Sequence, residues 1–394
     1  MSESVAAELP LVSVSITTHN RVGMVTHAVD SVLAQDYYCF EVIICDDGST
    51  DGTGEVIRAR YGDRVTYLYQ DNQGPAAARC ATIRHTRGEY IALMDDDDIW
   101  LPGKLSLQVA ALQQHPEAGL CYGLCLAGTP DGQRTERPHG QSHRGRSGDV
   151  FGLFLHRNVI MEPAVMVRRS VLEEVGGFDP AMAGGKDTDL FLRIALRHQA
   201  VYLREPLMVV RQHQGRRTRS IENRLRAPRA RARTMEKLLG MLPPERERFR
   251  PTLARRLVAA RAELLKLMLR EMDWEALCRE LEALYGEAGE LPVQGELAQA
   301  ATSALCEWTR AHAGEPEQLA AASPAQLADR LAATGGTAGT ADRAARLRTA
   351  LGLGALRQGR VVEGLRWMAR GASYRLQACL SHLLWAAGRA VRRL

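Results

Sequence analysis

The sequence predicts an α/β protein. A Rossmann-like, mostly parallel sheet with helices on both faces is expected over residues 1–230, followed by an all-α region over residues 231–394. Short apolar strand patterns alternate with helical patterns in the first hundred residues, and polar residues follow several of the strands. From about Leu225 onward strand patterns disappear, and Ala, Leu, Arg and Glu recur at helical spacing. These three observations predict the fold class.

The first hundred residues contain four predicted strands separated by helices. Each strand is a short run of β-branched or apolar residues, and Gly74-Pro75 is a typical helix start. This alternation is typical of a doubly wound sheet, in which ligands bind at the carboxyl ends of strands. We expect strands at Leu11–Thr17, Glu41–Cys45, Val65–Tyr69 and Tyr90–Met94, and helices at Val22–Ala34, Glu55–Arg60 and after Gly74.

The next hundred residues mix helices and strands around one long segment. Gly128–Gly148 is rich in Gly, Arg, Pro and His, and is expected to be a long mobile loop of the kind that carries specificity. We expect helices at Lys104–His115, Phe151–Asn158, Ser170–Val175 and Asp187–Leu196, and strands at Leu120–Leu126, Ala164–Arg168 and Val201–Val210.

Composition narrows the class of protein. A hydrophobic fraction of 45% supports a buried core, and 394 residues are enough for two domains. Eight cysteines without a CxxC pair predict neither a disulfide framework nor a zinc site. No apolar run is long enough to span a bilayer, and the first residues do not resemble a secretion signal. We therefore expect a cytoplasmic protein, either free or peripheral at the inner face of the cytoplasmic membrane.

The net charge of +5 is carried almost wholly by arginine. Codon usage in a GC-rich genome accounts for much of this bias, but the arginines are dense between Arg211 and Arg233. There they either bind phosphate or form a solvated basic face. Aromatic residues are not interleaved with them, so we do not expect nucleic acid as a partner.

Carboxylates follow two of the predicted strands. Four consecutive aspartates, Asp95–Asp98, come directly after a buried strand, and their mutual repulsion is costly unless a cation neutralises it. Asp46 and Asp47 end a second strand on the same predicted edge of the sheet. Mg²⁺ and Mn²⁺ bind such carboxylates together with water and phosphate oxygens. The pattern predicts a divalent-metal site, with a solvated acidic turn or helix cap as the alternative.

Four blocks occur in order along the first hundred residues: VSVSITTHNR, EVIICDDGSTDGT, NQGPAAAR and GEYIALMDDDDIWLPGKL. In this order and spacing they resemble the signature of family 2 inverting glycosyltransferases of bacterial type, and the resemblance extends over Leu11–His213. It implies a GT-A fold and the transfer of a sugar from a nucleotide diphosphate to an acceptor hydroxyl.

The resemblance also implies a donor site. Asp95 and Asp97 match the family's DxD pair: Asp97 is expected to bind Mn²⁺ or Mg²⁺, and Asp95 to approach the ribose or the water shell of the metal. One of Asp46 and Asp47 is expected to accept a hydrogen bond from the base, with an Asx turn as the alternative role. The residues expected to bind the nucleotide sugar are Thr17, His19, Arg21, Asp46, Asp47, Arg79, Asp95, Asp96, Arg216 and Arg217.

A second pair of motifs supplies a candidate base. Gly176–Asp179 and Gly184–Leu190 resemble the family's GGFD and (E)DxDL segments. Inverting transfer needs a carboxylate that takes the proton of the acceptor hydroxyl, and Asp187 matches that base. Because Asp187 begins a predicted helix, an N-cap is the alternative role.

Two positions depart from the family pattern. Cys80 stands where the family has Asn after Arg79, which alters a contact of that helix. Lys186 stands where the family has Glu before Asp187, and we expect its charge to lower the pKa of Asp187 and weaken the base. Both departures favour an alternative, a non-catalytic nucleotide-sugar- or carbohydrate-binding protein on a decayed transferase fold.

The residues after the last predicted strand complete the expected site. His213 is expected to be a metal ligand through a neutral imidazole, and Arg216 and Arg217 to hold the diphosphate. A plain loop histidine and a solvated basic face are the alternatives. The expected donor is a UDP-, GDP- or dTDP-linked sugar. The expected acceptor is a glycan, a lipid-linked molecule or a protein, in the synthesis of a cell-surface polysaccharide or other glycoconjugate.

The C-terminal region carries two further predictions. Tyr374–Leu394 places leucines on one helical face with arginines beside it, so it either packs on other helices or lies on an anionic membrane surface. The helices between Arg255 and Leu284 are expected to support a homodimer or bind a partner, and Thr334–Thr340 is expected to be a flexible break.

Overall fold

The computed structural model describes residues 9–270, except 130, 158 and 212–220. Contacts divide this part of the chain into two compact units. The first unit comprises residues 9–211 and Lys237–Arg250, and the second comprises residues 221–236 and 251–270. The domain boundary expected after residue 230 stays a prediction.

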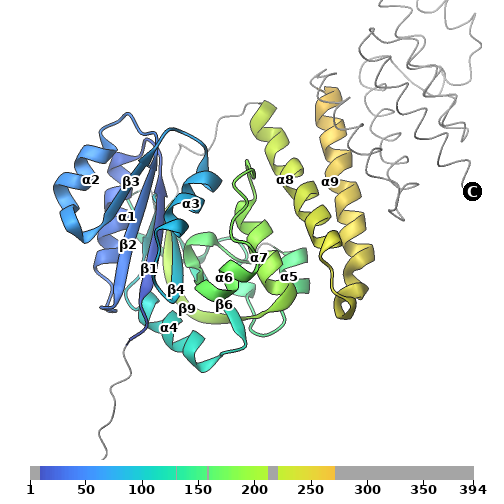
Figure 1. Ribbon diagram of the computed structural model, residues 1–394, viewed down its shortest axis with the longest axis horizontal. Coiled ribbons are helices and arrows are strands. Elements are labelled where there is room, and N and C mark those ends of the chain that lie inside the picture. Colours follow the sequence, from blue (N-terminus) through green and yellow to red (C-terminus); the bar gives the residue numbers. More distant parts are fainter. Residues whose placement is uncertain (1–8, 130, 158, 212–220, 271–394) are drawn as a thin grey trace, which may run out of the picture. The chain divides into compact units, whose positions relative to one another are not determined.

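In the first unit, nine strands form one sheet in the order β3-β2-β1-β4-β8-β6-β9-β5, with β7 paired to β6, counted over the described residues. Strands β1 to β4 are parallel to one another, as predicted. Figure 1 shows β1, β2 and β3 side by side in blue. The bounds are β1 (Val12–Thr18), β2 (Phe40–Asp47), β3 (Thr66–Gln70) and β4 (Tyr90–Asp95).

The other half of the sheet is mixed. β6 and β9 are parallel, whereas β8 is antiparallel to β4 and β6, and β5 is antiparallel to β9. The bounds are β5 (Asp98–Trp100), β6 (Ala118–Gly128), β7 (Arg134–Pro138), β8 (Met166–Arg168) and β9 (Gln199–Arg211). The prediction of a loop throughout Gly128–Gly148 is wrong for β7, whose backbone pairs with β6.

Helices cover both faces of the sheet, as predicted. Consecutive side chains of a strand point to opposite faces of the sheet. Ile16 of β1 points to one face, where it lies in the core that includes Val25 and Val29. Ser15 points to the opposite face, where its hydroxyl bonds that of Thr82. The helices of this unit are α1 (Val22–Leu33), α2 (Thr53–Tyr61), α3 (Pro75–Arg84), α4 (Lys104–Gln114), α5 (Phe151–His156), α6 (Arg169–Glu174) and α7 (Lys186–Arg197).

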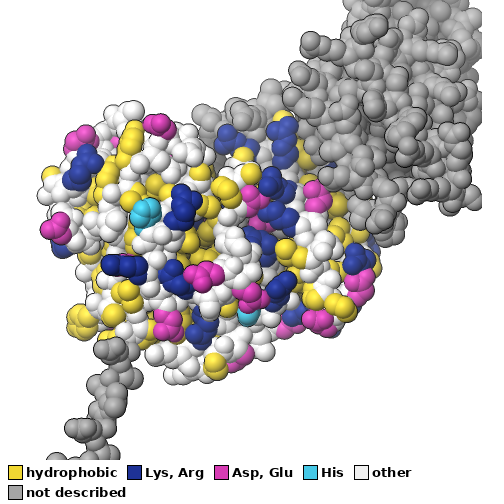
Figure 2. Space-filling view, viewed as in Figure 1, with side chains coloured by type: hydrophobic (Ala, Val, Ile, Leu, Met, Phe, Trp, Pro, Cys, Tyr) yellow, Lys and Arg dark blue, Asp and Glu magenta, His cyan; other side chains and the backbone are white. Residues whose placement is uncertain are grey.

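The main core lies between the sheet and helices α1, α2 and α4. Trp100 is only 2% exposed, and its indole nitrogen donates to the Pro163 carbonyl at 2.9 Å, so it packs in the interior. On the face drawn in Figure 2, hydrophobic side chains appear as scattered areas among polar and charged ones. Most apolar residues of the strands are therefore buried in the core. Their packing fixes the position of the polar residues at the strand ends.

The described part of the expected all-α region consists of α8 (Ile221–Gly240) and α9 (Arg250–Arg270), with a short 3-10 helix at Pro244–Phe249 between them. In the second unit, Arg231 pairs with Glu263 at 2.5 Å. Among the described residues, no helix has the length and apolar character needed to cross a membrane. The predictions for Thr334–Thr340 and Tyr374–Leu394, and for the end of Arg255–Leu284, lie outside the described residues.

Candidate active site

The carboxyl ends of β1, β2 and β4 lie next to one another. In the parallel register Thr18 is opposite Asp46, and Thr17 is opposite Asp95. The residues that the sequence places at these three strand ends therefore meet at one edge of the sheet. Doubly wound sheets bind ligands at this edge.

Three carboxylates gather in the turn that follows β4. Oxygen atoms of Asp95, Asp97 and Asp98 lie within 4.8 Å of one another. Arg21 Nη1 donates to Asp96 Oδ1 and to Asp97 Oδ2, each at 2.7 Å. Burial raises the pKa of Asp96, and the charge of Arg21 opposes that rise. Carboxylate oxygens at this spacing are the donor set that Mg²⁺ and Mn²⁺ prefer, so these residues fit a divalent ion.

Arg211, the last residue of β9, holds the backbone of this turn. Its Nε donates to the Asp97 carbonyl at 2.7 Å, and its Nη2 donates to the Asp96 carbonyl at 3.2 Å. Its backbone amide donates to Asp98 Oδ1 at 3.3 Å. With an exposure of only 1%, Arg211 fixes the turn from inside the protein.

A buried charge network of Arg79, Glu162 and Lys186 lies beside Asp95. Arg79 is fully buried and donates to Asp95 Oδ1 at 2.8 Å and to Glu162 Oε1 at 2.9 Å. Lys186 Nζ donates to Glu162 Oε2. Burial raises the pKa of Glu162, but Lys186 and Arg79 outweigh it and hold the pKa below its ordinary value. Glu162 is therefore a charged group between two cations.

Glu162 acts on the candidate site at two carboxylates. Burial and then the charge of Glu162 raise the pKa of Asp95 to about 7. The same two causes raise the pKa of Asp187, which α7 brings into the electrostatic surroundings of Glu162. Lys186 does act to lower the pKa of Asp187, but burial and Glu162 outweigh it. The prediction of a lowered pKa is wrong, because the sequence does not reveal that Lys186 is bound to Glu162.

Asp187 lies in the first turn of α7 without being its N-cap. The N-cap is Gly185, with φ at 62° in the left-handed region that favours glycine. Asp189, two residues after Asp187, is fully buried and pairs with Arg193 at 2.8 Å and with Lys237 at 3.1 Å. Within the described residues no cation forms an ion pair with Asp187. Of the two aspartates, Asp189 stabilises the helix packing, and Asp187 stays available for a proton.

Asp46 and Asp47 are both buried and both accept hydrogen bonds. Asp46 accepts from the backbone amide of Ser49 at 2.8 Å and from the Tyr67 hydroxyl at 2.7 Å. Asp47 accepts from the two backbone amides just before α3, at 2.9 and 2.8 Å. The turn-closing bond that was the alternative role is thus present at Asp46. Since each carboxylate oxygen offers two lone-pair sites, a further donor can still bind.

His19 is the most accessible member of the expected donor site. The side chain is exposed, and Nε2 lies 3.1 Å from the amide nitrogen of Asn20 and 3.3 Å from that of Asn72. Three other expected members, His213, Arg216 and Arg217, lie outside the described residues.

Glu162 is a further residue of the site that the sequence motifs do not predict. The available signal was weak: it is a lone acidic residue in the otherwise apolar run VIMEPAVMV. Cys80, the other departure from the family pattern, donates from Sγ to the Phe178 carbonyl at 3.3 Å. The thiol thus joins α3 to the Gly176–Asp179 segment.

Comparison with known proteins assigns the family. The model of the family described as Glycosyl transferase family 2 matches residues 13–176. WcaA of Escherichia coli K12, a glycosyl transferase named for colanic acid biosynthesis, is 32% identical over 195 residues, which are 48% of this chain and 67% of WcaA. The uncharacterized glycosyltransferase RT0329 of Rickettsia typhi is 29% identical over 219 residues, 55% of this chain and 68% of that relative. The chain spans only 33% and 26% of two further Rickettsia relatives.

Solved structures support the fold. The crystal structure of S. aureus TarS 1-349 in complex with UDP-GlcNAc aligns over 93% of this chain and 91% of that chain, with a TM-score of 0.51 and 15% identity. At this identity the likeness concerns the fold alone. Together with the parallel strands and their polar carboxyl ends, these findings show that the chain belongs to glycosyl transferase family 2, as an enzyme of the bacterial type with the GT-A fold.

Proposed function

We propose that the protein transfers a sugar, with inversion, from a nucleoside diphosphate to an acceptor hydroxyl in the synthesis of a cell-surface polysaccharide or other glycoconjugate. The observation that carries this proposal is the gathering of Asp95, Asp97 and Asp98 at the end of β4, within 4.8 Å of one another. The name of WcaA supports the polysaccharide context, and UDP-GlcNAc in the TarS complex supports a nucleotide-sugar donor.

The acidic turn would hold Mn²⁺ or Mg²⁺ through Asp97, with Asp95 toward the ribose or the water around the ion. A bound divalent ion neutralises the charge that develops on a departing diphosphate. Arg21 is already 2.7 Å from both Asp96 and Asp97, so it orients these carboxylates and adds positive charge at the same place. His213, Arg216 and Arg217 remain proposed ligands of the metal and the diphosphate.

The nucleoside would lie along the ends of β1 and β2. Thr17 lies near the end of β1 and His19 directly follows that strand, while Asp46 and Asp47 end β2. Asp46 and Asp47 are held by internal hydrogen bonds, so a base ring would meet acceptors whose positions are already fixed.

Asp187 would take the proton of the acceptor hydroxyl. Burial and the charge of Glu162 raise the pKa of Asp187, and a raised pKa makes its carboxylate a stronger base. Arg79, whose guanidinium is bonded to Asp95 and Glu162, would act on the donor site by positioning Asp95. Glu162 would in turn fix Lys186 next to the base.

We assign the transfer to residues 1–230, with the helical region as an accessory, interaction or membrane-surface element. Glycan, lipid-linked and protein acceptors, a homodimer and a location at the inner face of the cytoplasmic membrane remain compatible proposals. The donor is a UDP-, GDP- or dTDP-sugar.

The test is a thermal-shift screen of these donors with and without Mn²⁺, followed by an assay for sugar release. One nucleotide class should stabilise the protein in a metal-dependent way, and Asp97→Ala should abolish the effect. Asp63→Ala, which removes an exposed aspartate outside the site, is the matched control. Metal-dependent binding without sugar release from any donor would instead favour the non-catalytic binding protein, and no binding at all would refute both.

A further inference from the structure

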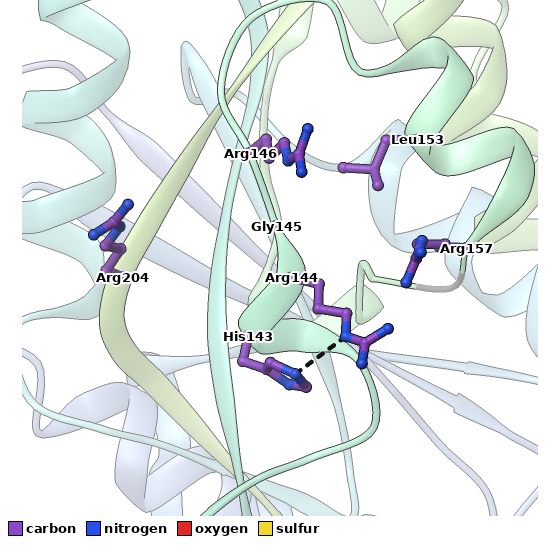
Figure 3. Close-up of a pocket in the computed structure, with 7 residues that line it drawn as sticks. All are labelled: His143, Arg144, Gly145, Arg146, Leu153, Arg157 and Arg204. Carbon is purple, nitrogen blue, oxygen red and sulfur yellow. Dashed lines mark hydrogen bonds between the residues drawn. The ribbon is translucent and has the colours of Figure 1, made fainter.

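One pocket of the first unit is lined mainly by cations. Its volume is about 670 Å³, and four arginines line it together with His143 and Leu153. Figure 3 shows Arg144, Arg146 and Arg157 around one opening with Leu153 beside them. Arg204 lies apart from these three, on β9 at the left of the view. No Asp or Glu is among the residues that line this pocket. We call it the arginine pocket.

The four guanidinium groups of the arginine pocket lack an acidic partner among the described residues. Over the part of the chain that the structure describes, no carboxylate forms an ion pair with any of them. Asp149, on the same loop as Arg146, is paired with Arg246 at 2.5 Å. Glu205 follows Arg204 on β9 but does not line the pocket. Positive charge is therefore concentrated in a concave site, and no carboxylate of the described residues pairs with it.

The loop that carries Arg144 and Arg146 is held in place. The hydroxyl of buried Tyr122 accepts from the Arg146 amide and donates to the Arg146 carbonyl, both at 2.9 Å. The Tyr202 hydroxyl donates to the Ser142 carbonyl at 2.8 Å. The backbone between them passes so close to Tyr202 that a Cβ on Gly145 would meet its ring at 2.2 Å. The arginines thus project from an ordered backbone, which lowers the entropic cost of binding.

The arginine pocket is separate from the strand-end site, by which we mean the polar residues at the carboxyl ends of β1, β2 and β4 together with the acidic turn Asp95–Asp98. Arg204 of the pocket and Arg211 of the acidic turn both lie on β9. Their separation along an extended strand corresponds to roughly 20 Å at the usual rise per residue. A donor nucleotide at the ends of β1, β2 and β4 would not fill both places.

We propose that the arginine pocket binds a phosphate or diphosphate group of a second ligand, distinct from the sugar donor. Guanidinium forks match the oxygens of phosphate in paired hydrogen bonds, and several of them favour a multiply charged anion over a single carboxylate. The volume exceeds that of one phosphate, and Leu153 offers an apolar wall for the group attached to it. The inference does not depend on the transferase mechanism. The phosphate can belong to a small soluble molecule or to a lipid headgroup.

The proposal is tested on the full chain with inorganic pyrophosphate, titrated by calorimetry in low salt and EDTA so that metal-dependent donor binding is absent. The test variant is Arg144→Gln/Arg157→Gln. Its matched control is Arg134→Gln/Arg137→Gln, which removes the same charge from exposed β7, outside the pocket. Thermal unfolding of all three proteins checks that each is folded.

We expect the test variant to bind pyrophosphate about a hundredfold more weakly, at about tenfold per guanidinium, and the control to change less than about threefold. Equal weakening in both variants would mean diffuse surface charge and would overturn the proposal, as would the absence of binding to the unmodified protein. Phosphatidylcholine vesicles with and without phosphatidic acid form a second arm. Pocket-dependent binding to the acidic vesicles identifies a lipid headgroup as the source, and binding of pyrophosphate alone identifies a soluble phosphate.

Discussion

The strand-end site and the arginine pocket use the same side chain in opposite ways. Arg79 is fully buried and Arg21 is half-buried, and each contacts a carboxylate at 2.7 to 2.9 Å. Arg144 and Arg157 are exposed, and no carboxylate pairs with them in the described chain. Burying an unpaired charge is costly, whereas an exposed guanidinium keeps its water. Arginine therefore orients carboxylates at the first site, and at the second it has no carboxylate partner among the described residues.

The largest expected effect concerns Asp187, the proposed base in the first turn of α7. Asp187→Asn should lower kcat by about 10²- to 10⁴-fold, because it removes the proton acceptor without changing shape. Donor binding, followed by thermal shift, should stay within about threefold of the unmodified protein if Asp187 touches only the acceptor. Asp63→Asn removes an equal charge from an exposed site and serves as the control. A near-normal kcat would exclude Asp187 as the base.

Breaking the charge pairing should cost stability. Glu162→Gln leaves fully buried Arg79 and half-buried Lys186 without their shared carboxylate, and should lower the free energy of unfolding by roughly 3–5 kcal/mol. Lys186→Met added to Glu162→Gln should restore part of the loss, since one unpaired cation is then removed. Urea unfolding of Glu162→Gln, of Lys186→Met and of the double variant measures the energetic coupling between Glu162 and Lys186. Simply additive changes would show that the pair is not energetically coupled.

A smaller effect is expected where an arginine contacts carbonyls of the acidic turn. Arg211→Met removes the hydrogen bonds to the Asp96 and Asp97 carbonyls. The Mn²⁺ concentration needed for donor binding should rise by about 10- to 100-fold, as is usual when support behind a metal ligand is lost. Arg197→Met, at an exposed arginine on α7, is the control. An unchanged Mn²⁺ requirement would separate Arg211 from the acidic turn.

A pH-dependent effect on stability is expected at Lys104, a fully buried cation without a carboxylate contact in the described structure. Its Nζ donates to Gln108 Oε1 at 2.6 Å and lies 3.9 Å from the centre of the Trp100 ring. Burial lowers the pKa of Lys104 to about 7. Between pH 7 and the ordinary lysine pKa the unfolded chain holds a proton that the folded chain has lost, so stability rises with pH there.

Lys104→Met removes this dependence. Its stability advantage over the unmodified protein should be greatest below pH 7, and should shrink by about 1.4 kcal/mol per pH unit as the pH rises toward 10. Urea unfolding at several pH values measures the difference, in which the titration of other groups cancels. A difference that does not vary with pH would mean that Lys104 keeps its ordinary pKa.

The sequence predicts the parallel half of the sheet well because its signals are local. Each strand from β1 to β4 is a short apolar run, and the acidic residues that end β2 and β4 follow directly in sequence. β5 has only three residues, and it exists because Asp98–Trp100 pairs with the distant strand β9. β7 likewise depends on pairing with β6. A segment rich in Gly and Arg has no local pattern that predicts this pairing. Long-range pairing decides these elements.

The same distinction explains what was missed at the site. Asp95, Asp97 and Asp187 could be named because they lie in ordered motifs. The effect of Glu162 depends on its meeting Arg79 and Lys186, which are far from it in sequence. Burial and the charge of Glu162 raise the pKa of Asp187, so the neighbouring Lys186 alone gave the wrong direction.

Strand β9 carries one arginine of each site, so its length sets the distance between the two sites. It carries Arg204 at the pocket and Arg211 at the acidic turn, and its Val210 pairs with Asp98 of β5. Because consecutive side chains of a strand point to opposite faces, deleting one residue between the two arginines would turn Arg211 away from the turn or shift Arg204 off the pocket. We therefore expect β9 to tolerate insertions and deletions only in pairs.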